Sequence, residues 1–166
     1  MFELRHFARF AATLLLIAGF CGLVQAQEGA RPTTRNPTEM KFAQFPGMPA
    51  CSSGSVQSGD PAKGSSIIFA KSPAGCSFPW HWHTPNEHLM MVTGVARVEM
   101  IDGKPAMLRP GAFAMMPSHH VHRFTCTKAC TLYVYSDAAF DIHYVDNQGR
   151  EIPSDEALKK THLPKK

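Results

Sequence analysis

Short apolar runs recur through the middle of the chain from residue 65 onward. Each run is rich in Ile, Val, Phe, Met or Tyr, and Gly, Pro, Asp or Asn interrupts the series at intervals of roughly eight to twelve residues. This pattern is typical of an antiparallel all-β barrel or sandwich. The predicted strands are Ser66–Lys71, Cys76–His81, Glu87–Thr93, Ala96–Ile101, Lys104–Arg109, Ala112–Met116, Val121–Cys126, Thr131–Ser136 and Phe140–Val145.

The flanks of this region have a different composition. Residues 27–64 are rich in Pro, Gly, Ser, Thr and Ala without sustained periodicity, which predicts an N-terminal arm with at most a short strand near Met40–Phe45. The pair Asp102-Gly103 predicts a two-residue hairpin turn between two of the predicted strands. Only Ser154–Thr161 has a helical pattern, with Ser154 as its N-cap. We therefore expect one domain at residues 65–146 and a C-terminal helix or tail at residues 147–166.

Residues 1–26 have the features of a secretory signal peptide. A basic start is followed by the apolar stretch Thr13–Val24, which is too short for a membrane span, and small residues up to Ala26 suit cleavage. The alternatives are an uncleaved anchor, or lipidation at Cys21, which the bulky Phe20 disfavours. The leader predicts export to the bacterial periplasm or the extracellular space, with no membrane association after cleavage.

The charge does not point to nucleic acid. The chain has 17 Lys and Arg against 13 Asp and Glu, a formal net charge of +4. The leader contributes +1 to this charge and four lysines in the tail contribute +4, so residues 27–158 have a formal charge of −1. A neutral body lacks the basic footprint of a nucleic-acid-binding protein. We expect a small-molecule partner instead.

The four cysteines beyond the leader predict two disulfides, because an even number in an oxidising compartment pairs. Cys126 and Cys130 separate two predicted strands, so we expect them to pair across the mouth of a hairpin. Four cysteines allow three pairings, and we favour the one that also joins Cys51 to Cys76. The alternative, thiolate metal ligands, lacks a second pair at zinc-site spacing.

Six of the nine histidines lie between residues 81 and 122. On a strand, His81 and His83 point to the same side. A turn then returns the chain with Glu87 near them, which gives two imidazoles and one carboxylate for a divalent first-row metal. His122 is the natural fourth ligand. His88 is the rival to Glu87, although strand parity favours Glu87.

Two motifs carry a resemblance to a known family. The pattern Gly75-x5-His81-x-His83-x3-Glu87-x6-Gly94 resembles the first cupin motif, and Gly111-x5-Pro117-x4-His122 is similar to the second. The resemblance covers about residues 65–145. It implies a small exported single-domain cupin, a double-stranded β-helix or jelly-roll barrel in which His81, His83, Glu87 and His122 converge on one metal.

The second motif departs from the family pattern at two positions. His119 stands where the family usually has Gly, and Cys126 stands where it usually has Asn. Neither position is a metal ligand in the pattern, so the departures concern the turn and the local hairpin. We expect His119 to adopt a positive φ and to point outward.

Further side chains are candidates for the cavity or for contacts with the ligands. His120 shares strand parity with His122. Asp141 and His143, near the end of the last strand, and Tyr133 or Tyr135 are also candidates, although a polar outer sheet face explains these residues equally well. The numerous methionines suggest copper, but we interpret most of them as core residues. The retained cavity candidates are His88, His120, Tyr133 and His143.

The predicted site leaves coordination positions open. Its ligands suit Mn, Fe, Ni, Co, Zn or Cu. We expect an enzyme that acts on a small oxygenated organic molecule, with oxygenase chemistry ahead of isomerase, lyase or hydrolase chemistry and Glu87 as a catalytic base. The alternative is a non-catalytic binding protein for a metal or small ligand. Residues 36–60 are predicted to mediate a homodimer.

Overall fold

A computed structural model describes residues 32–159 of the chain. The chain divides into two compact units, Met1–Thr34 and Arg35–Lys166, and the elements below belong to the second. The predicted leader lies outside the described residues. No helix within residues 32–159 has the length and apolar character needed to cross a membrane.

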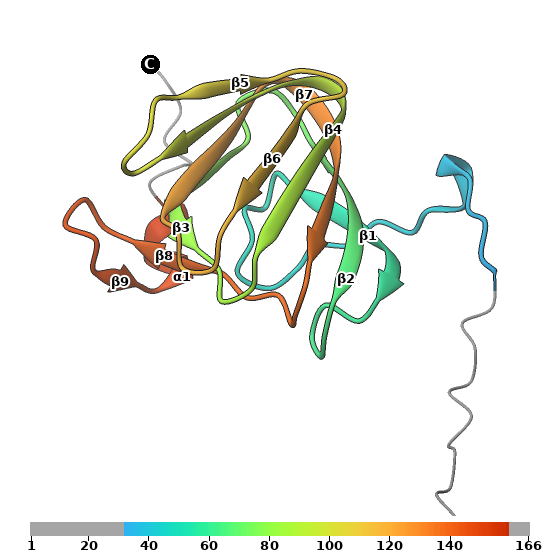
Figure 1. Cartoon of the computed structure of the whole chain (residues 1–166), viewed down its shortest axis with the longest axis horizontal. Helices are drawn as coiled ribbons and strands as arrows, with labels where there is room; N and C mark the ends of the chain where they lie inside the picture. The colour runs from blue at the N-terminus through green and yellow to red at the C-terminus, as the bar shows by residue number, and fades with distance from the viewer. Residues whose placement is uncertain (1–31, 160–166) are drawn as a thin grey trace, which may run out of the picture. The chain divides into compact units, whose positions relative to one another are not determined.

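Strands dominate the second unit, and the predicted all-β fold with a short C-terminal helix is confirmed (Figure 1). The elements in chain order are η1 Pro37–Glu39, β1 Ser53–Gly59, β2 Ser66–Ser72, β3 Ser77–Trp82, β4 Glu87–Met100, β5 Ala106–Leu108, β6 Phe113–Met116, β7 His122–Ser136, β8 His143–Val145, β9 Glu151–Ile152 and α1 Ser154–Lys159.

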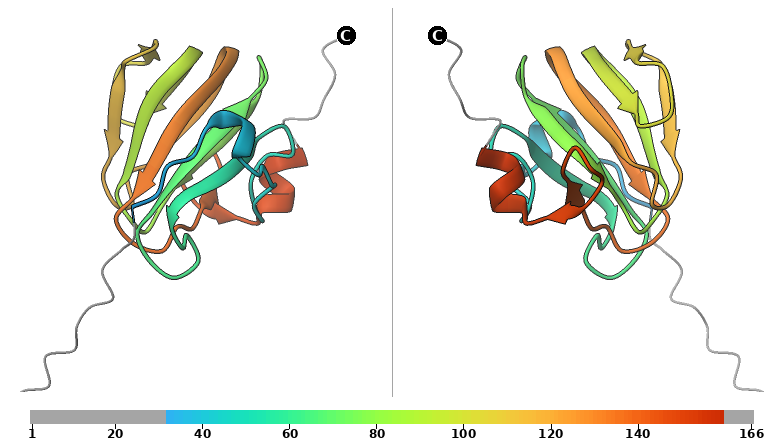
Figure 2. Two further views of the ribbon diagram at one scale, coloured as in Figure 1. Left: turned by 90° about the vertical axis from the view of Figure 1, so that its right-hand side faces the viewer. Right: turned by 90° about the vertical axis from the view of Figure 1, so that its left-hand side faces the viewer.

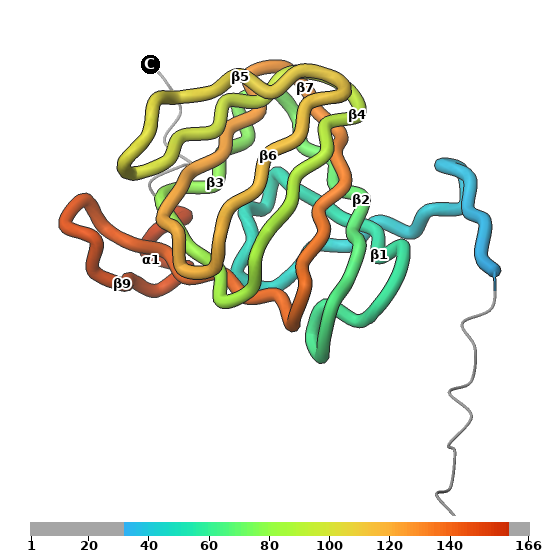
Figure 3. Tube along the Cα trace, in the orientation of Figure 1, coloured from blue at the N-terminus to red at the C-terminus, as the bar shows by residue number. Residues whose placement is uncertain are grey.

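Strands β4 and β7 are the longest and pair antiparallel along their whole length (Figure 3). The other edge of β4 pairs with β6 near its start and with β5 near its end. The other edge of β7 pairs with β3 at residues 122–125 and with β2 at residues 130–136. Each long strand therefore serves two halves of the sheet. Sequence analysis predicted two separate strands in place of β4 and two in place of β7, and this prediction is wrong.

The sheet does not close into a barrel. Its strand order is β1-β2-β7-β3-β8-β9, and β4 joins it through β7 while carrying β5 and β6. Within residues 32–159, no pairing connects β1 to β5 or β6. The expectation of a closed barrel is therefore corrected to an open jelly-roll sheet. The strands at the β4 edge are short, with three residues in β5 and four in β6, so they provide little edge for closure.

The Cys126–Cys130 disulfide is present, but the predicted hairpin is wrong. Both halves of β7 pair with β4 rather than with each other. The two Cα atoms lie 5.9 Å apart, whereas four steps along an extended strand span about 13 Å. The intervening residues therefore bulge out of the ladder. Opposite the bulge, Gly94 has a φ of 78°, and a Cβ there would collide with the carbonyl of Ala129.

The second disulfide, Cys51–Cys76, is also confirmed. It lies beside strand β1, which sequence analysis missed inside the expected arm. The strand sequence SGSVQSG has no alternating apolar residues, so it carries no periodic signal. The strand expected near Met40–Phe45 is only a single bridge between Ala43 and Gly54, with two backbone hydrogen bonds of 2.9 Å.

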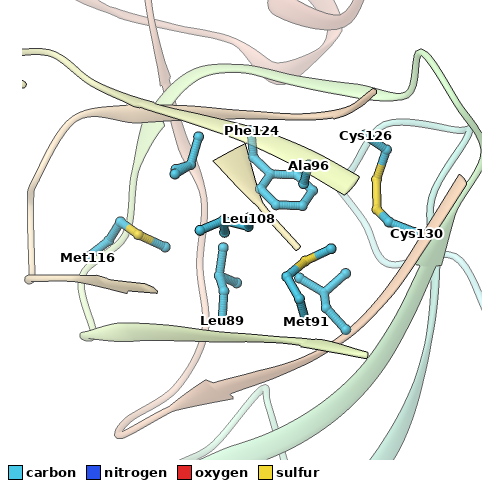
Figure 4. Close-up of a cluster of buried hydrophobic side chains, with 10 residues drawn as sticks. Leu89, Met91, Ala96, Leu108, Met116, Phe124, Cys126 and Cys130 are labelled. Carbon is cyan, nitrogen blue, oxygen red and sulfur yellow. A yellow bond between two sulfur atoms is a disulfide. The ribbon is translucent and has the colours of Figure 1, made fainter. Parts of the chain in front are cut away.

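A cluster of inward side chains from β4–β7 forms the hydrophobic core (Figure 4). Two of the methionines, Met91 and Met116, are buried in it, whereas Met107 and Met115 are 48% and 45% exposed. The interpretation of the methionines as core residues therefore holds for only part of them. The fully buried members of the cluster are Leu89, Met91, Ala96, Val98, Leu108, Met116, Phe124, Cys126, Cys130 and Leu132.

The C-terminal elements pack near β3. Strands β8 and β9 form a hairpin, and α1 lies beside it (Figure 2). The helix buries Ala157 and contacts both β8 and β3. Backbone hydrogen bonds from Glu156 and Ala157 reach the carbonyl of Pro153, so Ser154 lies in the first turn of the helix rather than at its N-cap. A hairpin joins β4 to β5 around Asp102-Gly103 as predicted, but its last pair is Val98↔Ala106, so the connection is longer than the expected two residues.

Candidate metal centre

Three histidines from two neighbouring strands converge in the interior. His81 lies near the end of β3, His83 directly follows that strand, and His122 is the first residue of β7. The backbones of His81 and His122 are register partners. One ring nitrogen of each histidine lies within 4.8 Å of the others, and all three side chains are buried. This cluster is compact enough to hold one metal ion.

Glu87 reaches the same cluster from the first position of β4. Its Oε1 lies 3.6 Å from His83 Nε2, and its Oε2 lies 3.3 Å from His122 Nε2. The side chain is buried. A buried carboxylate needs a partner, because isolated burial of a charge is costly. The carboxylate and the three rings together form an N3O donor set.

Backbone carbonyls orient all three rings in the same way. His81 Nδ1 donates to the carbonyl of Pro79 at 2.6 Å, and His122 Nδ1 donates to that of His120 at 2.9 Å. His83 Nδ1 donates to the carbonyl of Asp141. Each Nδ1 therefore carries the hydrogen, which leaves the Nε2 lone pair free for a metal.

Two of these Nε2 atoms, on His83 and His122, are buried without a hydrogen-bond partner in the described part of the chain. An unsatisfied buried polar atom costs about 1–3 kcal/mol. Two such atoms beside one carboxylate are unfavourable in a protein core unless a further group binds them. The donor set therefore fits a divalent transition metal.

The protonation states of the buried ligands also favour metal binding. Burial, together with the neighbouring rings, lowers the pKa of His81 well below its usual value, and burial lowers the pKa of His83 against the opposing effect of Glu87. Burial alone would raise the pKa of Glu87, but the imidazoles of His83 and His122 hold it below its ordinary value. Neutral imidazoles and an ionised carboxylate are the forms that bind metals.

A hydrogen-bonded turn fixes the spacing between His83 and Glu87. The backbone N–H of Asn86 donates to Asp137 at 3.0 Å, and its side-chain amide donates to the same carboxylate at 2.6 Å. Its side-chain oxygen accepts from the backbone N–H of Ser118 at 2.9 Å. Sequence analysis did not identify these positioning residues, whose only sequence signal is the polar turn.

The structure does not bring the four other cavity candidates to the cluster. His88 and Tyr133 lie on the outer sheet face, near Tyr135 and Phe69 respectively. His120 is 3.3 Å from Asp102, and only its backbone carbonyl supports a cluster residue. Alternation along β4 and β7 explains the placement of His88 and Tyr133, since neighbours of inward residues point outward. His120 precedes β7, so strand parity does not apply to it.

His143 lies outside the cluster because the last strand has the opposite parity. Tyr144, not His143, is the register partner of His81, and its buried ring lies 5.9 Å from the His81 ring. His143 instead stacks on Trp82 at 3.9 Å. Exposed His119 stacks on the same indole at 4.5 Å, with the expected positive φ of 61°.

A cavity of 340 Å³ opens beside the cluster. Its wall includes all four donor residues and side chains from β2, β3, β4 and β7, together with the segment that precedes β1. The Phe140 ring lies 4.5 Å from the His83 ring and covers one side. A volume of this size is in the range of small-molecule sites. The cluster is therefore accessible to a ligand.

Comparison with known proteins identifies the family. The cupin domain model matches residues 68–136, which include all four donor residues. Residues 68–136 therefore form a cupin domain. No curated protein sequence matches this cupin.

Solved structures share the cupin fold at low sequence identity. The polyketide cyclase RemF from Streptomyces resistomycificus has a TM-score of 0.64 and 16% identity over 81% of this chain and 95% of its own. An RmlC-like cupin from Shewanella frigidimarina has a TM-score of 0.55 and 15% identity over 66% and 92%. KdgF from Halomonas has a TM-score of 0.51 and 17% identity over 61% and 92%.

Proposed function

We propose that this cupin is an exported metalloenzyme that binds one divalent transition metal through His81, His83, Glu87 and His122. In this proposal, it acts on a small oxygenated organic molecule in the adjoining cavity. The observation that carries the proposal is the pair of unpartnered, buried Nε2 atoms beside the Glu87 carboxylate, at the wall of that cavity. The metal is Mn, Fe, Ni, Co, Zn or Cu, since the donor set suits each of them.

A bound metal in such a site supplies Lewis-acid activation, or a binding position for dioxygen or an oxygen ligand. The protein contributes the remaining requirements. Its carbonyls hold the three rings in one tautomer, and the apolar wall excludes water. Glu87 is ionised and lies at the cavity wall, so it suits a base that accepts a substrate proton. Oxygenase chemistry is favoured because the cavity wall is mostly apolar and the donors suit redox-active metals.

The second candidate is a non-catalytic carrier of a metal or a small ligand. A carrier of a metal alone needs no room for a second molecule beside the metal, so the 340 Å³ cavity argues against that form of carrier. The decisive property is whether an external molecule reaches the metal.

Cobalt substitution tests this property. The metal-free protein is loaded with Co²⁺, and its visible spectrum is recorded during titration with azide. An open coordination position predicts a saturable spectral change, which His122→Ala abolishes and His119→Ala preserves, because the His119 ring is exposed and stacks on Trp82 outside the cluster. A Co²⁺ spectrum that azide leaves unchanged would favour the carrier.

Export is part of the proposal. The two disulfides support an oxidising compartment, because such bonds are rare in the reducing cytosol. We propose the periplasm or the extracellular space, reached by cleavage of residues 1–26. N-terminal sequencing of the mature protein is expected to begin at Gln27. A mature protein that retains Met1 would contradict cleavage.

The homodimer through residues 36–60 also stays a proposal. Strand β1 lies at an edge of the sheet, and its own chain covers that edge only in part. Ala43 bridges Gly54, and the Arg35 guanidinium donates to the carbonyl of Val56 at 2.8 Å. A partner strand therefore has limited room there. Sedimentation as a monomer would exclude the dimer.

A further inference from the structure

The wall of the cavity is mostly apolar away from the donor residues. Strands β2, β4 and β7 contribute aliphatic side chains, and the segment before β1 adds an aromatic ring and a thioether. Such a wall gains free energy from contact with hydrocarbon and offers little to a polyol. The lining residues that carry this point are Ile68, Leu89, Leu132, Val134, Phe45 and Met48.

The charges on the wall restrict the ligand further. Glu87 and Asp141 are its charged residues, and among residues 32–159 no lysine or arginine lines it. The carboxylate of Asp141 is already engaged, since it accepts from the backbone of Thr84 at 2.7 Å and lies 3.3 Å from His143. A phosphate or second carboxylate on the ligand would meet no cation apart from the metal.

A hydrogen-bonded pair of buried serines, Ser52 and Ser72, lines the cavity away from the donor cluster. Glu87, Ser136 and Ser66 form a row across β4, β7 and β2. Ser72 lies six residues further along β2, which corresponds to about 20 Å of strand. Its hydroxyl donates to Ser52 at 3.0 Å, and both side chains are buried and line the cavity.

This arrangement leaves a donor at the far end. Because Ser52 accepts from Ser72, its own hydroxyl hydrogen is free, and within residues 32–159 no acceptor is paired with it. A buried hydroxyl in this position suits a single acceptor oxygen on a ligand.

We infer that the cavity takes an amphiphilic oxygen chelator. Its oxygen-bearing head binds at the histidine cluster, its hydrocarbon body lies along the apolar wall, and one acceptor oxygen at the far end receives the Ser52 hydroxyl. Sugars and phosphorylated metabolites are excluded by the same wall. The head of this ligand rests on the proposed metal function, whereas the body and the far end rest on the cavity alone.

A homologous series tests the body and the head. The Co²⁺-loaded mature protein is titrated by calorimetry with straight-chain alkyl hydroxamates of two to ten carbons. We expect the Kd to fall about threefold for each added methylene until the chain fills the cavity. Hexanohydroxamate should bind far more tightly than gluconohydroxamate, which has the same number of carbons. A flat series, or a preference for the polyol, would overturn the inference.

Matched variants locate the binding. Ala70 lines the cavity, so Ala70→Leu should shorten the chain length at which affinity stops rising, whereas Ala138→Leu on an exposed turn should not. Ser52→Ala should weaken a probe with a terminal ketone about fivefold and leave the plain alkyl probe unchanged. Ser55→Ala removes a buried hydroxyl outside the lining and serves as the control. Equal effects of Ser52→Ala on both probes would overturn the far-end assignment.

A separate arm distinguishes this inference from the proposed function. Straight-chain alkanols need no metal, and their binding to the metal-free protein is measured by displacement of a fluorescent apolar dye. If the protein fails to bind Co²⁺, the metal function fails, and the alkanol series still decides the apolar body. A threefold step per methylene supports that body, and a flat alkanol series refutes it.

Discussion

The two disulfides are predicted to differ in their contribution to stability. Cys51–Cys76 closes a loop with a sequence separation of 25, and Cys126–Cys130 closes one with a separation of 4. A disulfide stabilises mainly by restricting the unfolded chain, and the effect grows with the length of the closed loop. The chain-entropy relation gives about 3.5 kcal/mol for the longer loop and about 2 kcal/mol for the shorter one.

The comparison requires variants that cancel packing effects. Three of the four cysteines are buried, so their replacement by alanine alone would add a packing cost to the loss of the crosslink. One variant therefore carries Cys126→Ala and Cys130→Ala, and the other carries Cys51→Ala and Cys76→Ala. Each retains one disulfide, and each is melted in its oxidised and its reduced form.

Reduction should lower the Tm by about 12 °C where Cys51–Cys76 is the remaining bond, and by about 7 °C where Cys126–Cys130 remains. Reduction of Cys51–Cys76 should also weaken ligand binding, because the adjoining residues Ser52 and Ser53 line the cavity. Equal Tm shifts, or a larger shift for the short loop, would refute the loop-entropy reasoning.

Three further predictions concern the surroundings of the site. Tyr144→Phe removes the hydroxyl that donates to the carbonyl of Gly47 at 2.9 Å, and should lower the free energy of unfolding in urea by about 1–2 kcal/mol; an unchanged midpoint would contradict this. Asn86→Ala removes the side-chain bonds of the turn before Glu87 and should weaken metal affinity at least about tenfold in a chelator competition; wild-type affinity would speak against the turn. Buried neutral His81 and His83 have lowered pKa values, so below about pH 6.5 the unfolded chain binds more protons than the fold. The metal-free protein should lose stability as the pH falls below that value, and acid stabilisation in urea titrations would contradict the sign.

The donor cluster was predictable because chemistry and spacing coincide. His81, His83 and His122 meet in the structure as their strand positions implied. Strand parity also favoured Glu87 over His88 as the ligand, and in the structure His88 faces the other side of β4. These predictions used the alternation of His81 and His83, the turn before Glu87 and the resemblance to the two cupin motifs, none of which depends on the exact ends of the strands.

Features that depend on tertiary pairing were not predictable. Gly94 and the residues between Cys126 and Cys130 resemble turns in the sequence, yet they form a bulge within two continuous strands. Strand β1 has no apolar alternation and owes its structure to pairing with β2. In β8, a shift of one residue relative to the predicted register places Tyr144, rather than His143, opposite His81. Sequence alone does not fix such a register.

Elemental analysis of the protein purified from its own compartment tests the central claim most directly. The account predicts one transition-metal ion per chain in the wild type and in His119→Ala, and less than about a tenth of that in His122→Ala, whose circular dichroism should match the wild type. A folded His122→Ala protein that retains a full equivalent of metal, or a wild type that carries none, would contradict the four-residue site.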